Sequence, residues 1–385
     1  MELYIHIPFC VRKCEYCSFV SFPEKSAKKD EYIDLLLHES RERKEEFTEP
    51  VTTVYIGGGT PSLLSAGQLE RLVCGIKENV SLEHCVEFSI EANPGTVTDD
   101  FLCMAAGLGI NRISFGMQAA QARLLNTLGR IHTFRDVQES VYRAKKHKIQ
   151  NISLDLIFGI PGQTLRDWEE SLENAVSLDP FHISAYGLIP EEGTPLYERL
   201  AGGEITLPEQ ELEREMYDLA LRKLAGYGYL QYEISNFAKK GYACLHNIGY
   251  WTQVPYVGLG ISAASMRILK QDENGLECLR RNNPASYQAY MKMVLHRTTE
   301  EAEEEIVSPP ESRFETVMLA LRMNRGISEK RFSELHGVSL DACYGNKLKE
   351  MEQKGLMRHE YGAWMLTRRG MDIQNSILVE MMDDL

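Results

Sequence analysis

The feature that most constrains this chain is a set of three cysteines near its start. Cys10, Cys14 and Cys17 stand in a C-x3-C-x2-C pattern directly after the apolar run Leu3–Ile7, which predicts a buried strand. Three thiolates are one too few for a closed tetrahedral zinc site, and no second Cys or His pair follows. A [4Fe–4S] cluster held by three cysteines leaves one iron open to a ligand that is not protein. The spacing therefore favours a three-cysteine [4Fe–4S] site over a zinc site or a disulfide.

Length and composition limit the class of protein. The chain of 385 residues has room for one core of about 250 residues with a smaller appendage, or for two to three domains. Its net charge of −14 argues against a nucleic-acid partner, because affinity for phosphates rests on clustered Lys and Arg. No signal peptide or membrane-spanning run is predicted, and the other six cysteines are scattered as in a reducing compartment, so we expect a cytoplasmic protein.

Short apolar strands alternate with amphipathic helices through about residue 240. Six such strand–helix units predict an α/β fold with a parallel sheet. A partial, TIM-like (β/α)6 barrel over residues 1–240 fits better than a doubly wound sheet, although periodicity alone does not separate them. The predicted strands are Leu3–Ile7, Thr53–Ile56, Glu87–Glu91, Arg112–Gly116, Asn151–Ile157 and His182–Tyr186, with a further strand at Gln231–Phe237. The predicted helices are Asp30–Glu46, Gln68–Asn79, Asp99–Leu108, Thr133–His147, Leu165–Ser177 and Pro208–Leu224.

The remainder of the chain has a different character. Residues 241–305 are predicted to be a connecting segment. It ends in an acidic run over 300–305, and we interpret this run as a linker or a solvated helix start. Residues 306–385 predict a small winged-helix-like α+β domain. Its expected elements are helices at Glu311–Arg322, Ser328–His336 and Leu340–Lys354 and a hairpin of Met357–Tyr361 with Ala363–Leu366. DNA binding is disfavoured because Pro310–Leu385 carries 11 Lys/Arg against 12 Asp/Glu, so packing on the barrel or on a protein is expected.

Polar and glycine residues follow several of the predicted strands. The loop Gly57–Pro61 (GGGTP) lets backbone approach a ligand closely, although a plain tight turn is the alternative. Glu91 ends the third strand and could accept hydrogen bonds from ribose hydroxyls. Asp155 is a charge inside an apolar strand, so it must be paired or bind a polar group. Ligand sites of parallel α/β folds lie at the carboxyl ends of strands. These residues should therefore meet there with the segment Cys10–Cys17, here called the cysteine loop.

Six ordered motifs give the chain a family resemblance. They are Tyr4–Cys10 (YIHIPFC), the Gly57–Pro61 loop, Glu91–Pro94 (EANP), Ser114–Gln118 (SFGMQ), Leu128–His132 (LGRIH) and Asp155–Gly162 (DLIFGIPG). With them the chain resembles the oxygen-independent coproporphyrinogen III oxidase group of radical S-adenosylmethionine (SAM) proteins. The resemblance implies a cluster-bound SAM touched by Tyr4, Gly58, Glu91 and Ala264. In the oxidase branch, positions matching Tyr16, Gly59, Thr60, Gln118, Arg130, Asp155 and Gly187 contact a second SAM.

Two departures indicate the branch within that group. The oxidases extend the cysteine motif to a fourth cysteine, where this chain has Phe19, and they carry a long leader before a cluster that here begins at residue 10. Both departures are shared with the HemW-type heme chaperone branch, as is the H-N-x-x-Y-W sequence of His246, Asn247, Tyr250 and Trp251. On a loop, His246 could expose an imidazole to heme iron while Tyr250 and Trp251 cover the porphyrin. A buried histidine with two core aromatics is the alternative.

The resemblance thus implies a heme chaperone that binds a [4Fe–4S] cluster, SAM and heme and passes heme to a recipient hemoprotein. The alternative is an oxygen-independent coproporphyrinogen III oxidase (dehydrogenase), which converts two propionates to vinyl groups. A zinc-stabilised winged-helix regulator is disfavoured by the charge of the chain and by the missing fourth metal ligand.

Overall fold

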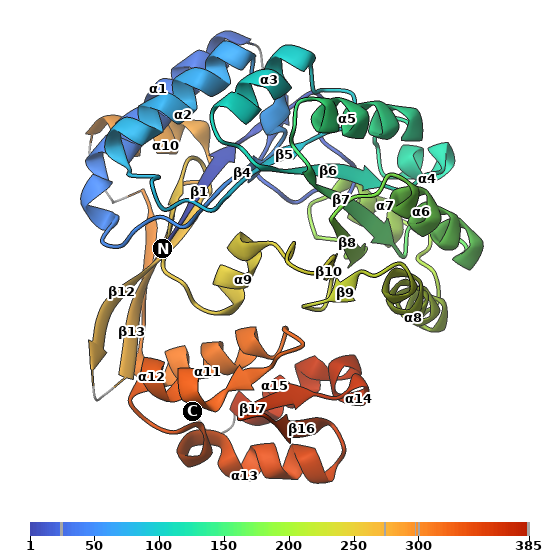
Figure 1. Ribbon diagram of the computed structural model, residues 1–385, viewed down its shortest axis with the longest axis vertical. Helices are drawn as coiled ribbons and strands as arrows, with labels where there is room; N and C mark the ends of the chain where they lie inside the picture. Colours follow the sequence, from blue (N-terminus) through green and yellow to red (C-terminus); the bar gives the residue numbers. More distant parts are fainter. Residues whose placement is uncertain (24–25, 273–274, 297, 299–300, 383–385) are drawn as a thin grey trace.

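The computed structural model describes residues 1–23, 26–272, 275–296, 298 and 301–382. Its centre is one curved, open sheet of twelve strands in the order β14-β13-β12-β11-β1-β4-β5-β6-β7-β8-β10-β9 (Figure 1). The run from β11 to β8 is parallel throughout. The expected partial barrel is confirmed, and it does not close. Its parallel strands are β1 (Glu2–Ile7), β4 (Thr53–Gly58), β5 (Glu87–Ala92), β6 (Arg112–Gln118), β7 (Asn151–Phe158), β8 (His182–Gly187) and β11 (Tyr256–Leu259).

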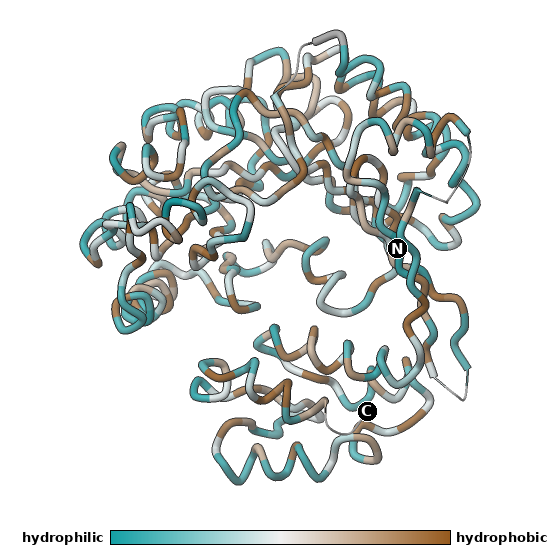
Figure 2. Tube along the Cα trace, turned by 180° about the vertical axis from the view of Figure 1, so that it is seen from behind, coloured by the Kyte–Doolittle hydropathy of each residue, from teal (hydrophilic) through white to brown (hydrophobic). Residues whose placement is uncertain are grey.

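Helices cover the outer, convex side of this sheet (Figure 1). Ser65, Thr133 and Thr164 each form a capping box at the start of a helix, which explains why the helices begin directly after polar turns. The alternation of apolar and polar residues along these outer helices is visible in Figure 2. The helices are α1 (Ser26–Glu42), α2 (Ala66–Asn79), α3 (Asp99–Gly107), α4 (Ala122–Thr127), α5 (Phe134–Lys146), α6 (Leu165–Ser177), α7 (Pro195–Ala201), α8 (Gln210–Gly226) and α10 (Tyr287–His296).

The two flanks of the sheet differ from the expectation. The strand predicted at Gln231–Phe237 is instead a short antiparallel pair, β9 (Leu230–Gln231) and β10 (Asn236–Ala238), because the chain turns between them. On the other flank β12 (Ala264–Asp272), β13 (Gly275–Asn282) and β14 (Glu303–Val307) add antiparallel strands. Much of the acidic run is therefore a strand and not a linker or helix start; Glu300 lies outside the described residues.

The C-terminal part forms a small α+β unit with a core of its own, which includes Phe332, Leu348 and Trp364. The three expected helices and the hairpin are present, and the hairpin joins a third short strand in the order β15-β17-β16. These elements are α11 (Pro309–Ala320), β15 (Ile327–Ser328), α12 (Glu329–His336), α13 (Leu340–Gln353), β16 (Met357–Glu360), β17 (Ala363–Leu366), α14 (Arg368–Asp372) and α15 (Gln374–Met382). This arrangement agrees with a winged-helix-like unit.

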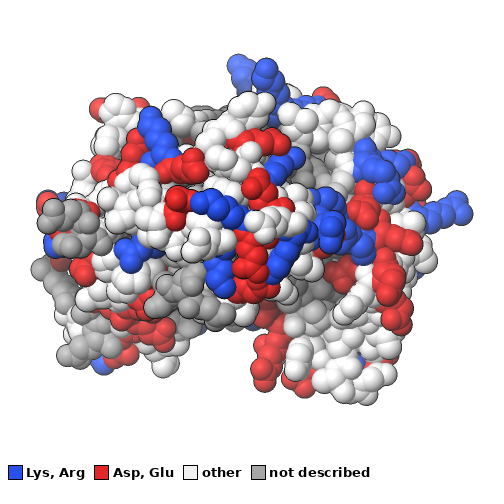
Figure 3. All heavy atoms as spheres, turned by 90° about the horizontal axis from the view of Figure 1, so that it is seen from below, with Lys and Arg blue, Asp and Glu red and all other residues white. Residues whose placement is uncertain are grey.

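The C-terminal unit lies across the open side of the sheet, and α9 (Leu245–Trp251) lies between the two (Figure 1). Ion pairs Arg214–Asp372 and Arg368–Asp218 join the unit to α8. The face seen from below carries acidic and basic side chains interspersed (Figure 3). None of the helices among the described residues is long and apolar enough to cross a bilayer.

Candidate functional site

The concave side of the sheet holds a cavity of about 370 Å³, here called the cysteine cavity. It begins at the carboxyl ends of β4 to β8, where the strand-end residues were expected to meet. The cysteine loop forms another part of its wall. Of the residues singled out in the sequence, it is lined by Cys10, Cys14, Tyr16, Cys17, Gly58, Gly59, Glu91, Gln118, Arg130, Asp155, Gly187 and Asn247.

The cysteine loop is tied to the ends of neighbouring strands by backbone hydrogen bonds. Gly59 and Thr60 donate to the carbonyls of Ile7 and Phe9 over 2.8 and 2.7 Å, and Glu15 donates to Leu128 over 3.0 Å. A Cβ on Gly59 would stand 2.7 Å from the Phe9 carbonyl oxygen. The close approach of the two loops thus requires glycine at this position, which explains part of the GGGTP motif.

A chain of side-chain hydrogen bonds connects two of the cysteine sulfurs. Thr60 donates from Oγ1 to Cys10 Sγ at 3.6 Å and accepts from Asn93 Nδ2 at 2.8 Å. Arg130 donates to Asn93 Oδ1 at 2.8 Å and to Cys14 Sγ at 3.4 Å. Hydrogen bonds to sulfur stabilise the thiolate form of a cysteine. They also tune the reduction potential of an iron–sulfur cluster that such thiolates bind. Asn93 is the residue of this set that sequence reasoning missed, although it stands inside the EANP motif.

Glu91 is half-buried near the end of β5, and protein donors hold both of its oxygens. The Tyr55 hydroxyl donates to Oε1 at 2.9 Å and the Gly58 backbone N–H donates to Oε2 at 3.0 Å. Burial raises the pKa of Glu91 to about 7, although the bond from Tyr55 opposes this shift. Each carboxylate oxygen has a second lone pair, so the side chain still accepts hydrogen bonds from a ligand.

Asp155 lies deeper in the cysteine cavity, and its partner is a hydroxyl. Ser114 Oγ on β6 contacts both carboxylate oxygens at 2.9 and 3.1 Å. Burial raises the pKa of Asp155, against the effect of hydrogen bonds from Ser184 and Ser114. Nearby, Gln118 has a left-handed backbone with φ of 63°, a conformation that is strained for a non-glycine residue and concentrates at ligand sites.

Arg112 is a lining residue that the sequence did not single out. It is 2% exposed at the start of β6, and its Nε has no hydrogen-bond partner among the described residues. Its position inside an apolar strand was the available signal, as it was for Asp155. The positive charge lies near the carboxylates of Glu91 and Asp155 and lowers their pKa values, although desolvation has the larger effect.

This donor set fits an iron–sulfur cluster and a polar ligand beside it. Within the described residues no three His, Cys, Asp or Glu side chains converge as a single metal ion would require. A [4Fe–4S] cluster does not need such convergence, because each thiolate binds a different iron. The remaining hydrogen-bonding groups of Glu91 and Asp155 then suit an adenosine or amino-acid moiety.

A second cavity, of about 500 Å³, lies between the sheet and the C-terminal unit and is here called the domain cavity. Helix α9 and the cysteine loop stand between the two cavities, since Asn247 lines the first and Tyr250 and Trp251 line the second. Phe19, 64% exposed, lines both. The domain cavity is lined by Tyr4, His6, Ser18, Phe19, Val20, Tyr250, Trp251, Gln253, Tyr256, Ser262, Ala264, Met266, Cys278, Arg280, Glu315 and Leu319.

Two residues that the resemblance assigns to SAM, Tyr4 and Ala264, thus line the domain cavity and not the cysteine cavity. Thr60 lines neither, because it is buried behind Cys10.

The expectation that His246 stands on an exposed loop is wrong. The residue lies in helix α9 and is 1% exposed. Both ring nitrogens are engaged, Nδ1 with Thr53 Oγ1 at 2.8 Å and Nε2 with the Tyr250 hydroxyl at 2.9 Å. Burial lowers the pKa of His246 to about 3, so the ring is neutral. The helix forms because the Glu87 carboxylate accepts the backbone N–H groups of Leu245 and His246 at its start.

Comparison with known proteins identifies the family of the chain. Residues 4–175 match the family model of the radical SAM superfamily, and residues 307–373 match the HemN C-terminal domain. The chain is 37% identical to the heme chaperone HemW of Bacillus subtilis (strain 168), over 99% of both chains. It is 31% identical to the heme chaperone HemW of Escherichia coli (strain K12), over 98% of this chain and 97% of that one. The chain belongs to the HemW family of radical-SAM proteins.

The fold agrees with this membership. The structure of coproporphyrinogen III oxidase (HemN) from Escherichia coli matches with a TM-score of 0.83 over 99% of this chain and 89% of that one, at 20% identity. This chain therefore shares the fold of that protein, including the C-terminal unit. Membership of the radical-SAM superfamily implies a [4Fe–4S] cluster and SAM.

Proposed function

We propose that this protein is a cytoplasmic heme chaperone that holds a [4Fe–4S] cluster and SAM, binds heme and passes it to a recipient hemoprotein. The observation that carries the proposal is the domain cavity. Its volume is within the range of about 300–1,000 Å³ typical of cofactor sites. Its wall contains Tyr250 and Trp251 of the H-N-x-x-Y-W sequence, whose flat faces suit a porphyrin.

Cys10, Cys14 and Cys17 would bind three irons of the cluster. When bound, the cluster and SAM supply one-electron chemistry that no amino-acid side chain provides. The residues of the chain bind and orient these groups. Thr60 and Arg130 donate hydrogen bonds to cysteine sulfurs, and Glu91 accepts hydrogen bonds from a polar ligand. From the family resemblance we further propose SAM contacts for Tyr4, Tyr16, Gly58, Gly59, Thr60, Glu91, Gln118, Arg130, Asp155, Gly187 and Ala264.

For heme, Tyr250 and Trp251 would contact the porphyrin directly, and Asn247 would face the cysteine cavity. His246 has no free ring nitrogen for iron as the structure stands. We therefore assign it a positioning function, since its bond to the Tyr250 hydroxyl fixes one of the two aromatic faces.

A heme-retention assay on the reconstituted full-length protein tests this function. Anaerobically reconstituted protein should retain heme through gel filtration with a Soret band, and transfer it to an apo-hemoprotein. The same preparation, given coproporphyrinogen III and reductant, should form no vinyl-bearing product. Failure to retain heme together with conversion of coproporphyrinogen III would replace the proposal with the oxidase function.

The cluster assignment is tested separately. Replacing Cys10, Cys14 or Cys17 with Ala should abolish iron–sulfur absorbance after reconstitution, because a cube with two protein ligands is not retained. Cys74→Ala is the matched control, since Cys74 is an exposed cysteine on α2. Equal loss in the control would show that the absorbance reports non-specific iron.

A further inference from the structure

The domain cavity contains one opposed pair of charges. Of its lining residues, Arg280 on β13 and Glu315 on α11 are the ones with charged side chains, and their Nη2 and Oε2 atoms lie 2.8 Å apart. His6 also lines the cavity, but burial lowers its pKa, so its ring is neutral. The remaining wall is aromatic, aliphatic or neutral polar. Any anionic group that enters the domain cavity therefore finds Arg280 as its one cationic partner among the lining residues.

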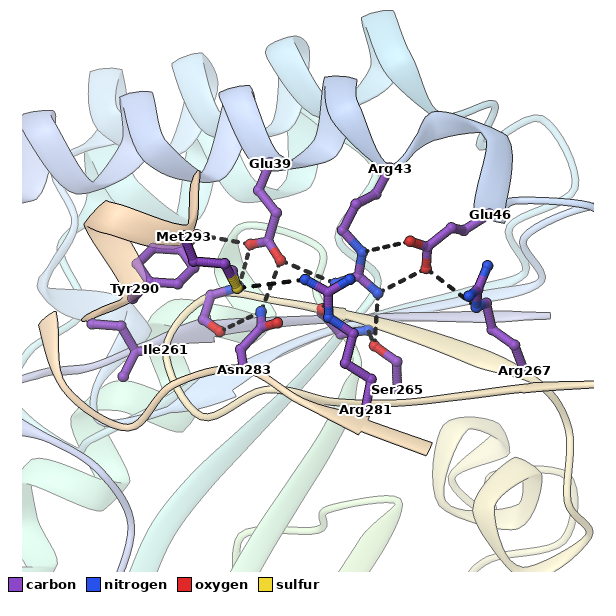
Figure 4. Close-up of polar contacts among 12 residues, drawn as sticks. Glu39, Arg43, Glu46, Ile261, Ser265, Arg267, Arg281, Asn283, Tyr290 and Met293 are labelled. Atoms are coloured by element: carbon purple, nitrogen blue, oxygen red, sulfur yellow. Dashed lines mark hydrogen bonds and ion pairs between the residues drawn. The ribbon is translucent and has the colours of Figure 1, made fainter. Parts of the chain in front are cut away.

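Arg280 belongs to the barrel side of the domain cavity, on β13. Side chains alternate across a strand, so its neighbour Arg281 points to the opposite face of β13, toward α1 and α10. There Arg281 donates to Met293 Sδ of α10 at 3.4 Å. It lies beside a buried polar network in which Arg43 donates to Glu39 at 3.0 Å and to Ser265 Oγ at 2.9 Å (Figure 4). Asn283, at the end of the same strand, donates to Glu39 at 2.7 Å. The strand that carries Arg280 is thus fastened to the barrel.

Glu315 belongs to the C-terminal unit and not to the barrel. It stands on α11 of the C-terminal unit, with its side chain 17% exposed. Burial raises the pKa of Glu315, and the nearby Glu305 and Glu311 act in the same direction, while Arg280 opposes them. The charged form of Glu315 is consequently disfavoured by its surroundings, and the contact with Arg280 is what stabilises it. An exchange of partner at Arg280 would leave Glu315 without compensation and favour its movement away from the barrel.

We propose that Arg280 recognises a carboxylate of the ligand in the domain cavity, and that this carboxylate displaces Glu315 and loosens α11 from the barrel. This inference rests on the proposed function, in which the ligand is heme with its two propionates. Glu315 meets Arg280 through one contact, from Oε2 to Nη2. A guanidinium group can bind a carboxylate through two parallel hydrogen bonds, so a ligand carboxylate could replace Glu315 as the partner of Arg280. Binding would then open the contact between the two units, on the side where a recipient protein could reach the heme.

Heme titration of three variants tests the exchange. Arg280→Gln should weaken heme binding about tenfold, the size of effect for losing a charge-assisted hydrogen bond. Glu315→Gln should strengthen binding by a similar factor, because Arg280 is no longer occupied. The dimethyl ester of iron protoporphyrin has no free carboxylate, so its affinity should be the same for wild type and Arg280→Gln. Arg358→Gln, at an exposed residue of β16, is the matched control and should bind as wild type does.

Amide hydrogen exchange tests the movement. Heme should accelerate exchange in α11 of the wild type, and Glu315→Gln should show that acceleration without heme. If wild type binds heme and both Arg280→Gln and Glu315→Gln bind it with the affinity of wild type, the inference is overturned while the chaperone function stands. Circular dichroism spectra that match wild type would exclude misfolding of the variants. If wild type retains no heme, the proposed function itself fails and this inference with it.

Discussion

Glu91 and Asp155 are half-buried carboxylates that two parallel strands carry into the cysteine cavity, and each is held mainly by neutral donors. The sequence showed that Asp155 needed a partner, because an apolar strand surrounds it. It could not show that the partner is Ser114, which stands on the neighbouring strand β6 and becomes adjacent only through strand pairing. The same holds for Tyr55 and Glu91. Partners across strands depend on register, which the sequence of one strand does not specify.

Glu91 should contribute to SAM binding and not to cluster assembly. Replacing Glu91 with Ala removes an acceptor for ligand hydroxyls, so SAM binding should weaken by roughly 1–3 kcal/mol. Calorimetry on the reconstituted protein measures this, with iron content as the check on the cluster. Glu83→Ala, at an exposed residue, is the control and should leave SAM affinity unchanged. Unaltered affinity in Glu91→Ala would remove this residue from the SAM site.

The buried His246 should make the stability of the fold depend on pH. Its pKa in the folded protein, about 3, lies below the ordinary value of 6.5, so the unfolded chain binds more protons between these limits. The free energy of unfolding should therefore fall as the pH decreases from about 6.5 toward 3. Urea unfolding of wild type and His246→Gln at several pH values measures the effect. The variant should lose part of this dependence, and identical slopes would contradict a neutral buried ring.

At the scale of elements, the six strand–helix units were predictable because each combines an apolar strand with a capped amphipathic helix. Helix α9 was mistaken for a loop, since Asn247 and Gly249 lower its helix propensity and its stability comes from Glu87 on a distant strand. The expectation of a linker or a solvated helix start is wrong for β14, since its glutamates form a strand only by pairing with β13. Arg280 faces Glu305 and Arg281 faces Glu304 across β13 and β14. Both errors arise where tertiary contacts override local preference.

The end of β4 should tolerate no side chain at Gly58. Its φ is +109°, and an added Cβ would lie 2.5 Å from the His6 ring. Gly58→Ala should therefore lower the free energy of unfolding by more than about 1 kcal/mol and weaken SAM binding, because the Gly58 N–H anchors Glu91. Gly67→Ala is the matched control, since nothing lies within 4 Å of its added Cβ on helix α2.

Gly67→Ala should be neutral or stabilise the protein by up to about 1 kcal/mol. Thermal unfolding of the two variants and calorimetric SAM titration compare them. Equal stability of Gly58→Ala and Gly67→Ala would show that the end of β4 relaxes around a methyl group.

At the scale of the whole molecule, α9 links the cofactor side of the barrel to the C-terminal unit. Its Asn247 lines the cysteine cavity, while the centroid of its Trp251 ring lies 4.6 Å from the guanidinium carbon of Arg322, just beyond the end of α11. Gln253 just beyond α9 accepts a hydrogen bond from Thr316 of α11. One short helix therefore lines both cavities, and together with Gln253 it contacts the segment of α11 and Arg322 in the C-terminal unit.

Trp251 should accordingly hold the two units together as well as contact heme. Trp251→Ala removes a cation–π contact with Arg322 of about 0.5–2 kcal/mol and widens the domain cavity. Amide exchange in α11 should become faster even without heme, heme should dissociate faster, and iron content should stay at the wild-type level. Tyr142→Ala, at an exposed aromatic residue of α5, is the control. Faster heme loss with unchanged exchange in α11 would restrict Trp251 to ligand contact and assign the docking of the C-terminal unit to its ion pairs with α8.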